Sequence, residues 1–336
     1  MKNLHVDGHF MEDLTVSDKT LFLNEALSLF RHQAKENLLY AAYLKNLSID
    51  VEKVQTLDKI PFLPIGFFKT HQIKTHDFEE ECIFESSGTT SSINSKHCVK
   101  NISAYLNNAE RNFNEFYGEL KNYCILALLP SYLERTNSSL VCMAADFIKK
   151  SGHPKSGFFL HDQQTLHETL LELERVEQPT ILIGVTFALI DFAEKYQMKL
   201  NHTLLLETGG MKGRRKEMTR FELHQILTEN LGLQKIHAEY GMTELLSQAY
   251  SLGSGVFKTP KTMKVFLRAL DDPFDIWSEE DSRDQAGIIN IIDLANKDSI
   301  AFIATDDLGR FTGNGGFEVR GRIDNSDIRG CSLLSV

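Results

Sequence analysis

The sequence lacks the cysteine patterns of disulfide-rich and zinc-binding proteins. Its five cysteines are odd in number, and no two of them form a C-x-x-C motif. Twelve histidines are present, yet none combines with a cysteine in the spacing of a zinc-ligand set. We therefore expect free thiols, no structural zinc site and the reducing environment of the cytoplasm.

Long apolar runs and an excess of positive charge are also missing. The longest apolar run, residues 180–190, is too short to span a bilayer. The first residues lack the basic-then-apolar pattern of a signal peptide. The net charge of −10 argues against binding to nucleic acid. These features predict no transmembrane segment and no nucleic-acid partner, and they leave open whether the protein forms an oligomer.

What the 336 residues do contain is an ordinary apolar fraction, 42%, and a regular alternation of strand-like and helix-like segments. Strands are predicted at 123–129, 157–160, 180–183, 203–206 and 235–239, and helices at 17–47, 101–121, 138–150, 163–177, 185–198 and 215–231. This alternation predicts an α/β fold with a helix-covered, largely parallel sheet. The apolar segment 60–68 contains two prolines and is predicted to be extended. Beyond residue 250, short strands at 263–269, 287–292 and 300–304 predict a β-rich subdomain.

One hydroxyl-rich stretch lies at residues 84–92, where the sequence is F-E-S-S-G-T-T-S-S. Gly88 allows a turn that a side chain would block, and the surrounding amides and hydroxyls are suited to bind an anion, above all a phosphate. The stretch matches neither the P-loop nor the dinucleotide-binding motif. On local grounds alone, a solvated Ser/Thr loop is the simpler interpretation.

Three further polar loops follow predicted strands, which is where ligands bind in sheets of this kind. E-T-G-G at 207–210 is either a plain turn or a place where a flat or anionic group approaches the backbone. In E-Y-G-M-T-E at 239–244, Tyr240 offers a stacking surface and Thr243 a phosphate donor, while Glu244 is either a Mg²⁺ ligand or a helix N-terminal carboxylate. The paired acids of T-D-D-L-G at 305–309 suit ribose hydroxyls or the cap of a turn.

The order of these elements, closed by G-R-I-D at 321–324, resembles the adenylate-forming superfamily of acyl-CoA synthetases, peptide-synthetase adenylation domains and luciferases. The resemblance runs from about residue 60 to the end of the chain. It implies ATP and Mg²⁺ as cofactors, with Glu244 as the metal ligand and with Asp307 and Arg322 on the ribose. The other nucleotide-binding positions that it implies are Ser86, Ser87, Gly88, Thr89, Thr90, Gly209, Gly210, Tyr240, Gly241 and Thr243.

Segments 60–69, 129–135, 207–215 and 329–332 are more narrowly similar to acyl-protein synthetases, the fatty-acid-activating component of the bacterial luminescence fatty-acid reductase. This similarity implies that a fatty acid or another carboxylic acid is activated as an acyl-adenylate. The acyl group is then transferred to a cysteine near the C-terminus, which here is Cys331. From Cys331 it passes to an acyl-accepting protein partner, an acyl reductase or synthase.

Two departures from the superfamily pattern stand in the sequence. Ser91 replaces the usual last glycine of the phosphate loop. The chain also ends soon after the G-R-I-D motif, which implies an adenylate-forming domain at 1–320, a hinge remnant and flexible tail at 321–336, and no mobile C-terminal domain with its catalytic lysine. Lys212 and Arg215, beside the E-T-G-G loop, are candidates to supply positive charge instead, or they form a solvated basic helix start.

Two other functions remain open. A phenylacetate-type acyl-CoA ligase would use coenzyme A, and not Cys331, as the acyl acceptor. The implied absence of the C-terminal domain counts against it, because that domain normally builds the coenzyme A-binding face. The Ser91 departure keeps open a non-catalytic nucleotide- or acyl-binding partner of a larger reductase or synthase.

Overall fold

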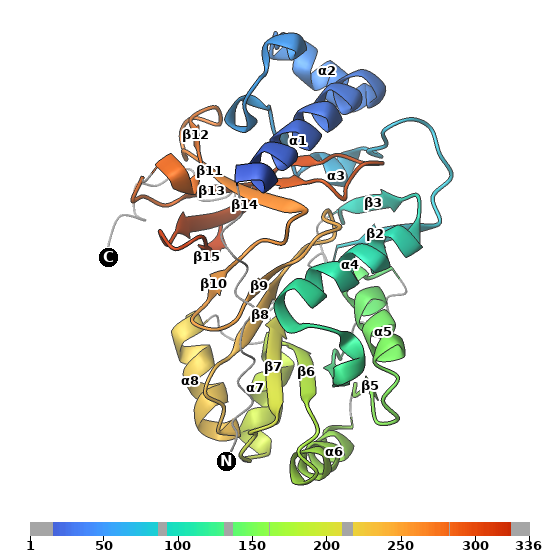
Figure 1. The fold of residues 1–336 in the computed structure, drawn as a ribbon, viewed down its shortest axis with the longest axis vertical. Coiled ribbons are helices and arrows are strands. Elements are labelled where there is room, and N and C mark those ends of the chain that lie inside the picture. Colours follow the sequence, from blue (N-terminus) through green and yellow to red (C-terminus); the bar gives the residue numbers. More distant parts are fainter. Residues whose placement is uncertain are drawn as a thin grey trace.

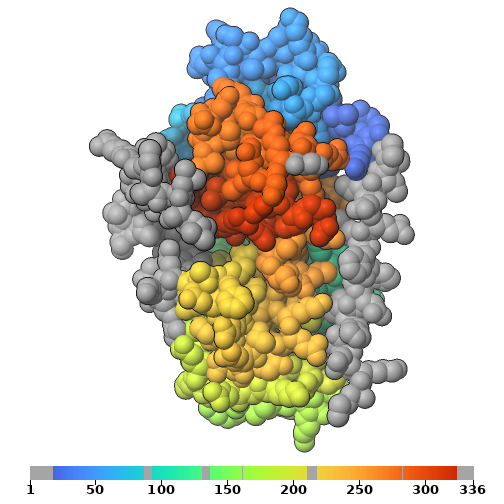
Figure 2. All heavy atoms as spheres, turned by 90° about the vertical axis from the view of Figure 1, so that its left-hand side faces the viewer, coloured from blue at the N-terminus to red at the C-terminus, as the bar shows by residue number. Residues whose placement is uncertain are grey.

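The fold consists of a helix-covered parallel sheet and a second, mainly antiparallel sheet stacked above it (Figure 1). It was obtained as a computed structural model, which describes residues 16–86, 93–130, 137–160, 162–209, 218–281 and 283–323. Figure 2 shows the antiparallel sheet, in orange and red, resting on the yellow part of the chain that includes helix α8 (Arg220–Leu231). The predicted α/β class and the β-rich part beyond residue 250 are confirmed.

Among the described residues, the lower sheet has six strands, and all neighbours are parallel except the last pair. In spatial order the strands are β5 (Gly157–Phe158), β4 (Cys124–Leu128), β6 (Thr180–Val185), β7 (Thr203–Thr208), β8 (His237–Tyr240) and β9 (Ala249–Ser251). Each predicted strand of the alternating region is present. Because β6, β7 and β8 are parallel neighbours, their carboxyl ends meet at one edge of the sheet.

Helices cover both faces of this sheet, and the alternation of side chains along each strand explains how. Ile181 and Ile183 pack in the cluster that includes α4 (Ile102–Tyr117) and α5 (Ser139–Ser151), whereas Leu182 packs in the cluster on the opposite face. That second cluster is covered by α6 (Gln163–Arg175), α7 (Thr186–Lys195) and α8. A strand buried on both faces needs the continuous apolar run that the sequence shows.

The upper sheet has seven strands in the described part of the chain. They are β1 (Leu63–Pro64), β10 (Val256–Phe257), β11 (Met263–Arg268), β12 (Ile276–Trp277), β13 (Gly287–Asp293), β14 (Phe302–Phe311) and β15 (Phe317–Arg322). β14 is much longer than the predicted strand at 300–304. The prediction that T-D-D-L-G at 305–309 forms a loop after that strand is therefore wrong, because the motif lies within β14. The proline-containing segment is extended as predicted at β1, which pairs in parallel with β14 before a short helix, α3 (Phe67–Thr70).

A small hairpin and short helical turns complete the described structure. Strand β2 (Cys82–Glu85) pairs with β3 (Lys96–Val99) on either side of the hydroxyl-rich stretch. The 3₁₀ turns are η1 (Val51–Lys53), η2 (Leu57–Lys59), η3 (Leu120–Asn122) and η4 (Glu279–Asp281). The hairpin therefore brings together the two segments that flank residues 87–92, the candidate phosphate loop.

The region predicted to be helical, 17–47, is helical but divided into two helices, α1 (Val16–Glu36) and α2 (Leu38–Asn46). Asn37 interrupts them with an extended backbone, and its side chain accepts a hydrogen bond from the Tyr40 amide at 3.0 Å. The same side chain donates to the Ser299 carbonyl at 3.1 Å. The chain therefore bends at a buried cap that also ties α1 and α2 to the upper sheet.

Replacing Asn37 with alanine should destabilise the protein by about 1–2 kcal/mol, because the helix cap is lost and the buried Ser299 carbonyl keeps Thr75 but loses Asn37 as a donor. Equilibrium urea unfolding, followed by the fluorescence of the single buried tryptophan, Trp277, measures this change. Asn46→Ala, at the exposed end of α2, is the matched control and should change stability by less than about 0.5 kcal/mol. Equal effects of the two substitutions would contradict the proposed role of the cap.

Candidate functional site

The carboxyl ends of β7 and β8 bring two of the predicted loops together. Thr208 and Glu239 are partners in the parallel register, so Gly209 and Gly241 leave neighbouring strands at the same edge. The Thr208 hydroxyl donates to Glu239 Oε2 at 2.5 Å, and burial raises the pKa of Glu239 to about 7. A Cβ at Gly241 would lie 2.3 Å from Glu239 Oε1, so a side chain at this position would have to displace the Glu239 carboxyl group.

Tyr240, Asp307 and Arg322 come from three strands and converge. The Tyr240 hydroxyl donates to Asp307 Oδ2 at 2.7 Å, and Arg322 Nε lies 3.9 Å from Asp307 Oδ1. Asp307 and Arg322 are direct partners across β14 and β15. Burial raises the pKa of the Asp307 carboxyl, although the Tyr240 hydroxyl and the Arg322 charge oppose the shift. The Tyr240 ring, 8% exposed, packs against Phe257 and Phe317, so its predicted stacking role stays a prediction.

Glu244 lies next to the base of the hydroxyl-rich stretch. Its side chain is 5% exposed, and it is hydrogen-bonded to Ser95. Ser95 in turn pairs with Ser86, because the Ser86 amide donates to the Ser95 carbonyl at 3.0 Å and the Ser95 amide donates to Ser86 Oγ at 2.9 Å. Burial raises the pKa of Glu244, and the nearby Arg322 charge opposes that shift. The segment 239–244 therefore contacts Thr208 through Glu239, Asp307 through Tyr240 and Ser95 through Glu244.

A group of buried polar residues behind these loops has no counterpart in the predictions. His97, 1% exposed, places Nδ1 2.8 Å from the Thr243 carbonyl oxygen and Nε2 3.1 Å from Asn296 Oδ1. Asn296 donates to the Glu244 carbonyl at 2.8 Å. Burial lowers the pKa of His97 to about 4. The sequence shows only a lone histidine in an apolar strand and an asparagine in a turn, which more often indicate packing and capping than a site.

The first residue of the E-T-G-G loop, Glu207, is a second buried carboxylate. The Thr186 hydroxyl lies 2.9 Å from Glu207 Oε1 and 2.8 Å from the Gly209 carbonyl oxygen. Gly209 has a φ of 71°, a left-handed conformation that favours glycine. Thr186 therefore links the start of α7 to the point where the chain leaves β7.

Several predicted site residues lie outside the described part of the chain. They are Ser87, Gly88, Thr89, Thr90, Gly210, Lys212, Arg215 and Cys331. The roles assigned to them stay predictions. The predicted residues that the structure brings to one edge are Ser86, Gly209, Tyr240, Gly241, Thr243, Glu244, Asp307 and Arg322.

The four described cysteines, by contrast, are placed as packing residues. Cys98 and Cys124 are buried, while Cys82 and Cys142 are partly buried, and all four are free thiols. Burial raises the pKa of each thiol, and that of Cys124 to about 11. A thiolate nucleophile needs the opposite shift, so none of these four is suited to accept an acyl group.

The surroundings of Glu244 are compatible with a magnesium ion. Within the described ranges, no three His, Cys, Asp or Glu side chains gather as a metal site. Mg²⁺ in nucleotide sites needs only one or two carboxylates, because substrate phosphates and water complete its coordination. The buried Glu244 carboxylate, with its raised pKa, would gain the counter-charge that it lacks.

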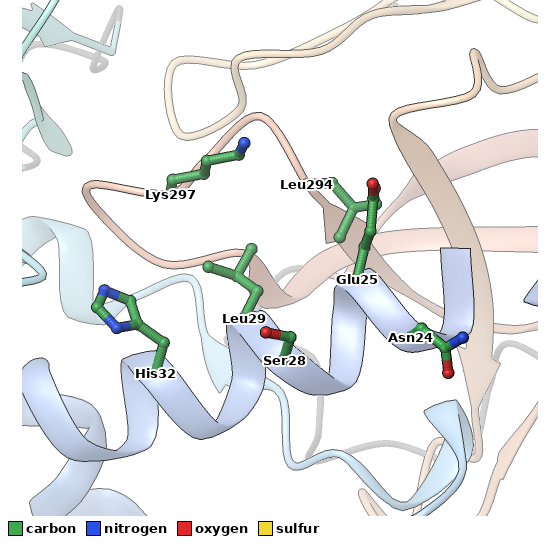
Figure 3. A pocket seen from close by; sticks show the side chains of 7 residues that line it. All are labelled: Asn24, Glu25, Ser28, Leu29, His32, Leu294 and Lys297. Atoms are coloured by element: carbon green, nitrogen blue, oxygen red, sulfur yellow. The ribbon is translucent and has the colours of Figure 1, made fainter. Parts of the chain in front are cut away.

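A pocket of about 450 Å³ lies along α1, and two of its lining residues, Leu294 and Lys297, are close in sequence to Asn296. Figure 3 shows the side chains around it. Its lining residues are Asn24, Glu25, Ser28, Leu29, His32, Leu294 and Lys297. None of them is a predicted site residue.

Among the helices that the structure describes, none is long and apolar enough to cross a membrane.

An α/β fold with polar loops at the carboxyl ends of its parallel strands defines a ligand-binding edge. The chain belongs to the LuxE acyl-protein synthetase family, whose model matches residues 7–335. The predicted family is therefore confirmed. A comparison with curated proteins finds no match.

Solved structures with a similar fold include a luciferase-like enzyme from the mealworm Zophobas morio, at 18% identity and a TM-score of 0.49. The match covers 78% of this chain and 62% of the mealworm enzyme. A long-chain-fatty-acid–CoA ligase from Archaeoglobus fulgidus is 14% identical with a TM-score of 0.49, over 72% of this chain and 51% of that one. The O-succinylbenzoate–CoA synthetase of Bacillus subtilis, solved with ATP and magnesium, is 15% identical with a TM-score of 0.49, over 90% and 62%. The chain thus spans between about half and two thirds of the length of these proteins.

Glu239→Gln should change how stability depends on pH. Because the pKa of Glu239 rises from 4.5 to about 7 on folding, the wild type should lose unfolding free energy as pH increases through that interval. The glutamine variant has no such titration, so at pH 8 it should be the more stable protein, by up to about 3 kcal/mol, and at pH 4.5 the difference should be small. Urea unfolding at both pH values tests this, with the exposed Glu79→Gln as the control. A difference that does not depend on pH would contradict the assignment.

Proposed function

We propose that this protein activates a fatty acid or another carboxylic acid with ATP, forming an acyl-adenylate, and transfers the acyl group to Cys331 as a thioester. A partner protein such as an acyl reductase would then receive the acyl group. Family membership supports the proposal. The observation that carries it is the convergence of the Tyr240–Asp307–Arg322 group and Glu244 at the edge where the hydroxyl-rich stretch begins.

Asp307 and Arg322 suit the ribose of ATP. Asp307 has one carboxylate oxygen engaged by Tyr240 at 2.7 Å, while the other lies 3.9 Å from Arg322, a distance too long for a direct hydrogen bond. A sugar hydroxyl can therefore donate to the second oxygen. The Arg322 side chain is 60% exposed, so it is open to a ligand. Tyr240 holds the carboxylate in place, and a buried hydrogen bond of this kind preorganises the acceptor.

Glu244 and the hydroxyl-rich stretch suit the phosphates. When bound, Mg²⁺ would neutralise charge on the phosphate oxygens. Glu244 would hold that ion, and Thr243 together with the stretch from Ser86 to Thr90 would donate hydrogen bonds to the phosphates. Lys212 and Arg215 would supply further positive charge. The Ser86–Ser95 pair keeps the start of this stretch beside Glu244.

The proposed reaction has two steps. In the first, a carboxylate oxygen of the acid attacks the α-phosphorus of ATP, and the bond to the bridging oxygen breaks, releasing pyrophosphate. In the second, the Cys331 thiolate, having lost its proton to solvent, attacks the acyl carbon. The bond between that carbon and the adenylate oxygen breaks, releasing AMP and leaving a thioester. The division into a domain at 1–320 and a tail at 321–336 that carries the thiol is part of the proposal.

Glu244→Gln should lower ATP–pyrophosphate exchange by on the order of 100-fold, because it removes the anionic metal ligand while preserving its size. The fold should survive, with an unchanged or higher melting temperature, because a buried carboxylate with a raised pKa is removed. Exchange is measured over a range of Mg²⁺ concentrations, with the exposed Glu52→Gln as the control. Wild-type exchange with unchanged Mg²⁺ dependence would rule out Glu244 as the ligand.

Cys331→Ser should retain pyrophosphate exchange and lose stable labelling by fatty acid that hydroxylamine can remove. The reason is that a thioester, unlike the oxygen ester that serine would form, is cleaved readily by hydroxylamine, and the other described cysteines are packing residues. The measurement is mass spectrometry of the protein after incubation with ATP, Mg²⁺ and a panel of carboxylic acids. Cys98→Ser serves as the control.

Three outcomes distinguish the alternatives. Labelling of another cysteine would remove Cys331 from the mechanism. Exchange without protein labelling, but with thioester release when coenzyme A is added, would identify an acyl-CoA ligase. Absence of exchange with every acid in the panel would support a non-catalytic binding protein.

A further inference from the structure

The segment 241–248 carries two of the proposed ligand-binding side chains, yet it forms neither helix nor strand. Its backbone polar groups therefore need partners from elsewhere in the chain. Two buried side chains bind consecutive carbonyl groups of this segment. His97 Nδ1 lies 2.8 Å from the Thr243 oxygen, and Asn296 donates to the Glu244 oxygen at 2.8 Å.

These two carbonyls belong to the peptide planes on either side of Glu244. Peptide planes are rigid, so holding both of them restricts the two backbone angles of the residue between them. The direction of the Cα–Cβ bond, from which the Glu244 side chain extends, follows from those angles. His97 and Asn296 therefore act on the Glu244 carboxylate without touching it.

The proton of the His97 ring is assigned from the contacts of its two ring nitrogens. At pH 7 the ring is neutral, because burial lowers its pKa to about 4, and a neutral imidazole has one N–H. Both ring nitrogens face oxygen atoms: Nδ1 faces the Thr243 oxygen at 2.8 Å, and Nε2 faces Asn296 Oδ1 at 3.1 Å. We assign the proton to Nδ1, which makes the shorter of the two contacts. Nε2 then faces another acceptor, an arrangement that local hydrogen bonding alone would not select.

The ring is held rigidly enough to act as a support. His97 lies opposite Phe84 in the β2–β3 hairpin, and the edge-on ring of Phe68 packs against it with 5.6 Å between the ring centroids. Asn296 is fully buried. Because β3 follows the hydroxyl-rich stretch, the same hairpin supports the candidate phosphate loop and the backbone beside Glu244.

We propose that His97 is a positioning residue: its Nδ1–H, donated to the Thr243 carbonyl, works with Asn296 to fix the two peptide planes beside Glu244 and so directs the Glu244 carboxylate toward the bound metal. The inference rests on the proposed function, because it assigns Glu244 to the metal of ATP. It adds a residue that contacts neither the nucleotide nor the acid.

Two substitutions separate this role from simple core packing. His97→Asn can place an amide N–H near the position of Nδ1–H, whereas His97→Gln places its amide near Nε2 and leaves the Thr243 carbonyl without a donor. We expect His97→Asn to keep ATP–pyrophosphate exchange within about threefold of wild type. His97→Gln should raise the Mg²⁺ concentration for half-maximal exchange and lower the maximal rate by on the order of tenfold, because a small misplacement of a site residue is costly.

Thermal unfolding of both variants is the matched measurement. If His97 served only to fill the core, the two variants would lose activity in proportion to their loss of stability, and that result would overturn the proposal. Equal exchange defects at equal stability, or a larger defect in His97→Asn, would overturn it as well.

A spectroscopic measurement on the wild type tests the proton assignment independently of activity. In protein labelled with ¹⁵N-histidine, the ring nitrogens of His97, assigned by comparison with His97→Asn, should show a protonated Nδ1 and an unprotonated Nε2 at pH 7. The opposite tautomer would overturn the proposal. If the wild type shows no ATP–pyrophosphate exchange with any acid of the panel, the proposed function fails. The chemical shifts of the ring nitrogens still decide whether His97 donates to Thr243.

Discussion

One buried carboxylate, Asp293 at the end of β13, joins the two sheets through hydrogen bonds to the segment that follows β8. Its oxygens accept hydrogen bonds from the amides of Leu246 and Ser247 at 2.8 and 3.0 Å, from the Ser247 hydroxyl at 2.7 Å and from the Ala295 amide at 3.1 Å. Four donors offset much of the cost of removing this group from water, although burial still raises its pKa. Residues 246–247 follow the loop after β8, so Asp293 joins the parallel sheet to the antiparallel one. The candidate site lies at this junction, and the loop that carries Glu244 ends at it.

Much of the parallel sheet could be predicted because burial on both faces imposes a simple sequence pattern on its strands. A strand covered by helices on both faces must be apolar at every position, and β4 and β6 are apolar runs of this kind whose residues are all buried. The break at Asn37 imposes no such pattern, because the apolar spacing continues through it. An asparagine inside a helical pattern becomes a cap only when a tertiary contact stabilises the bend. Here that contact is with the Ser299 carbonyl, which lies 262 residues further along the chain.

The candidate site shows the same division between what a motif can and cannot indicate. Tyr240 could be singled out because it lies at the end of a predicted parallel strand, where ligands bind. Asp307 was expected just beyond a short strand but lies within β14, and Arg322 was indicated only by the resemblance to the adenylate-forming superfamily. The sequence did not indicate that the Tyr240 hydroxyl would bind Asp307, since that contact joins two different sheets. The stacking surface predicted for Tyr240 stays a prediction, and in the structure its ring packs against Phe257 and Phe317.

His97, Asn296 and Asp293 were missed for a common physical reason. All three bind main-chain atoms of the segment around Glu244, and every residue type offers the same main-chain atoms. Such contacts therefore impose no residue pattern on the segment that receives them. Residues that face a ligand need particular side chains at particular spacings, so a sequence shows them. Residues that hold an irregular loop from behind need only a polar atom at the right place in three dimensions, and the structure alone brings them into view.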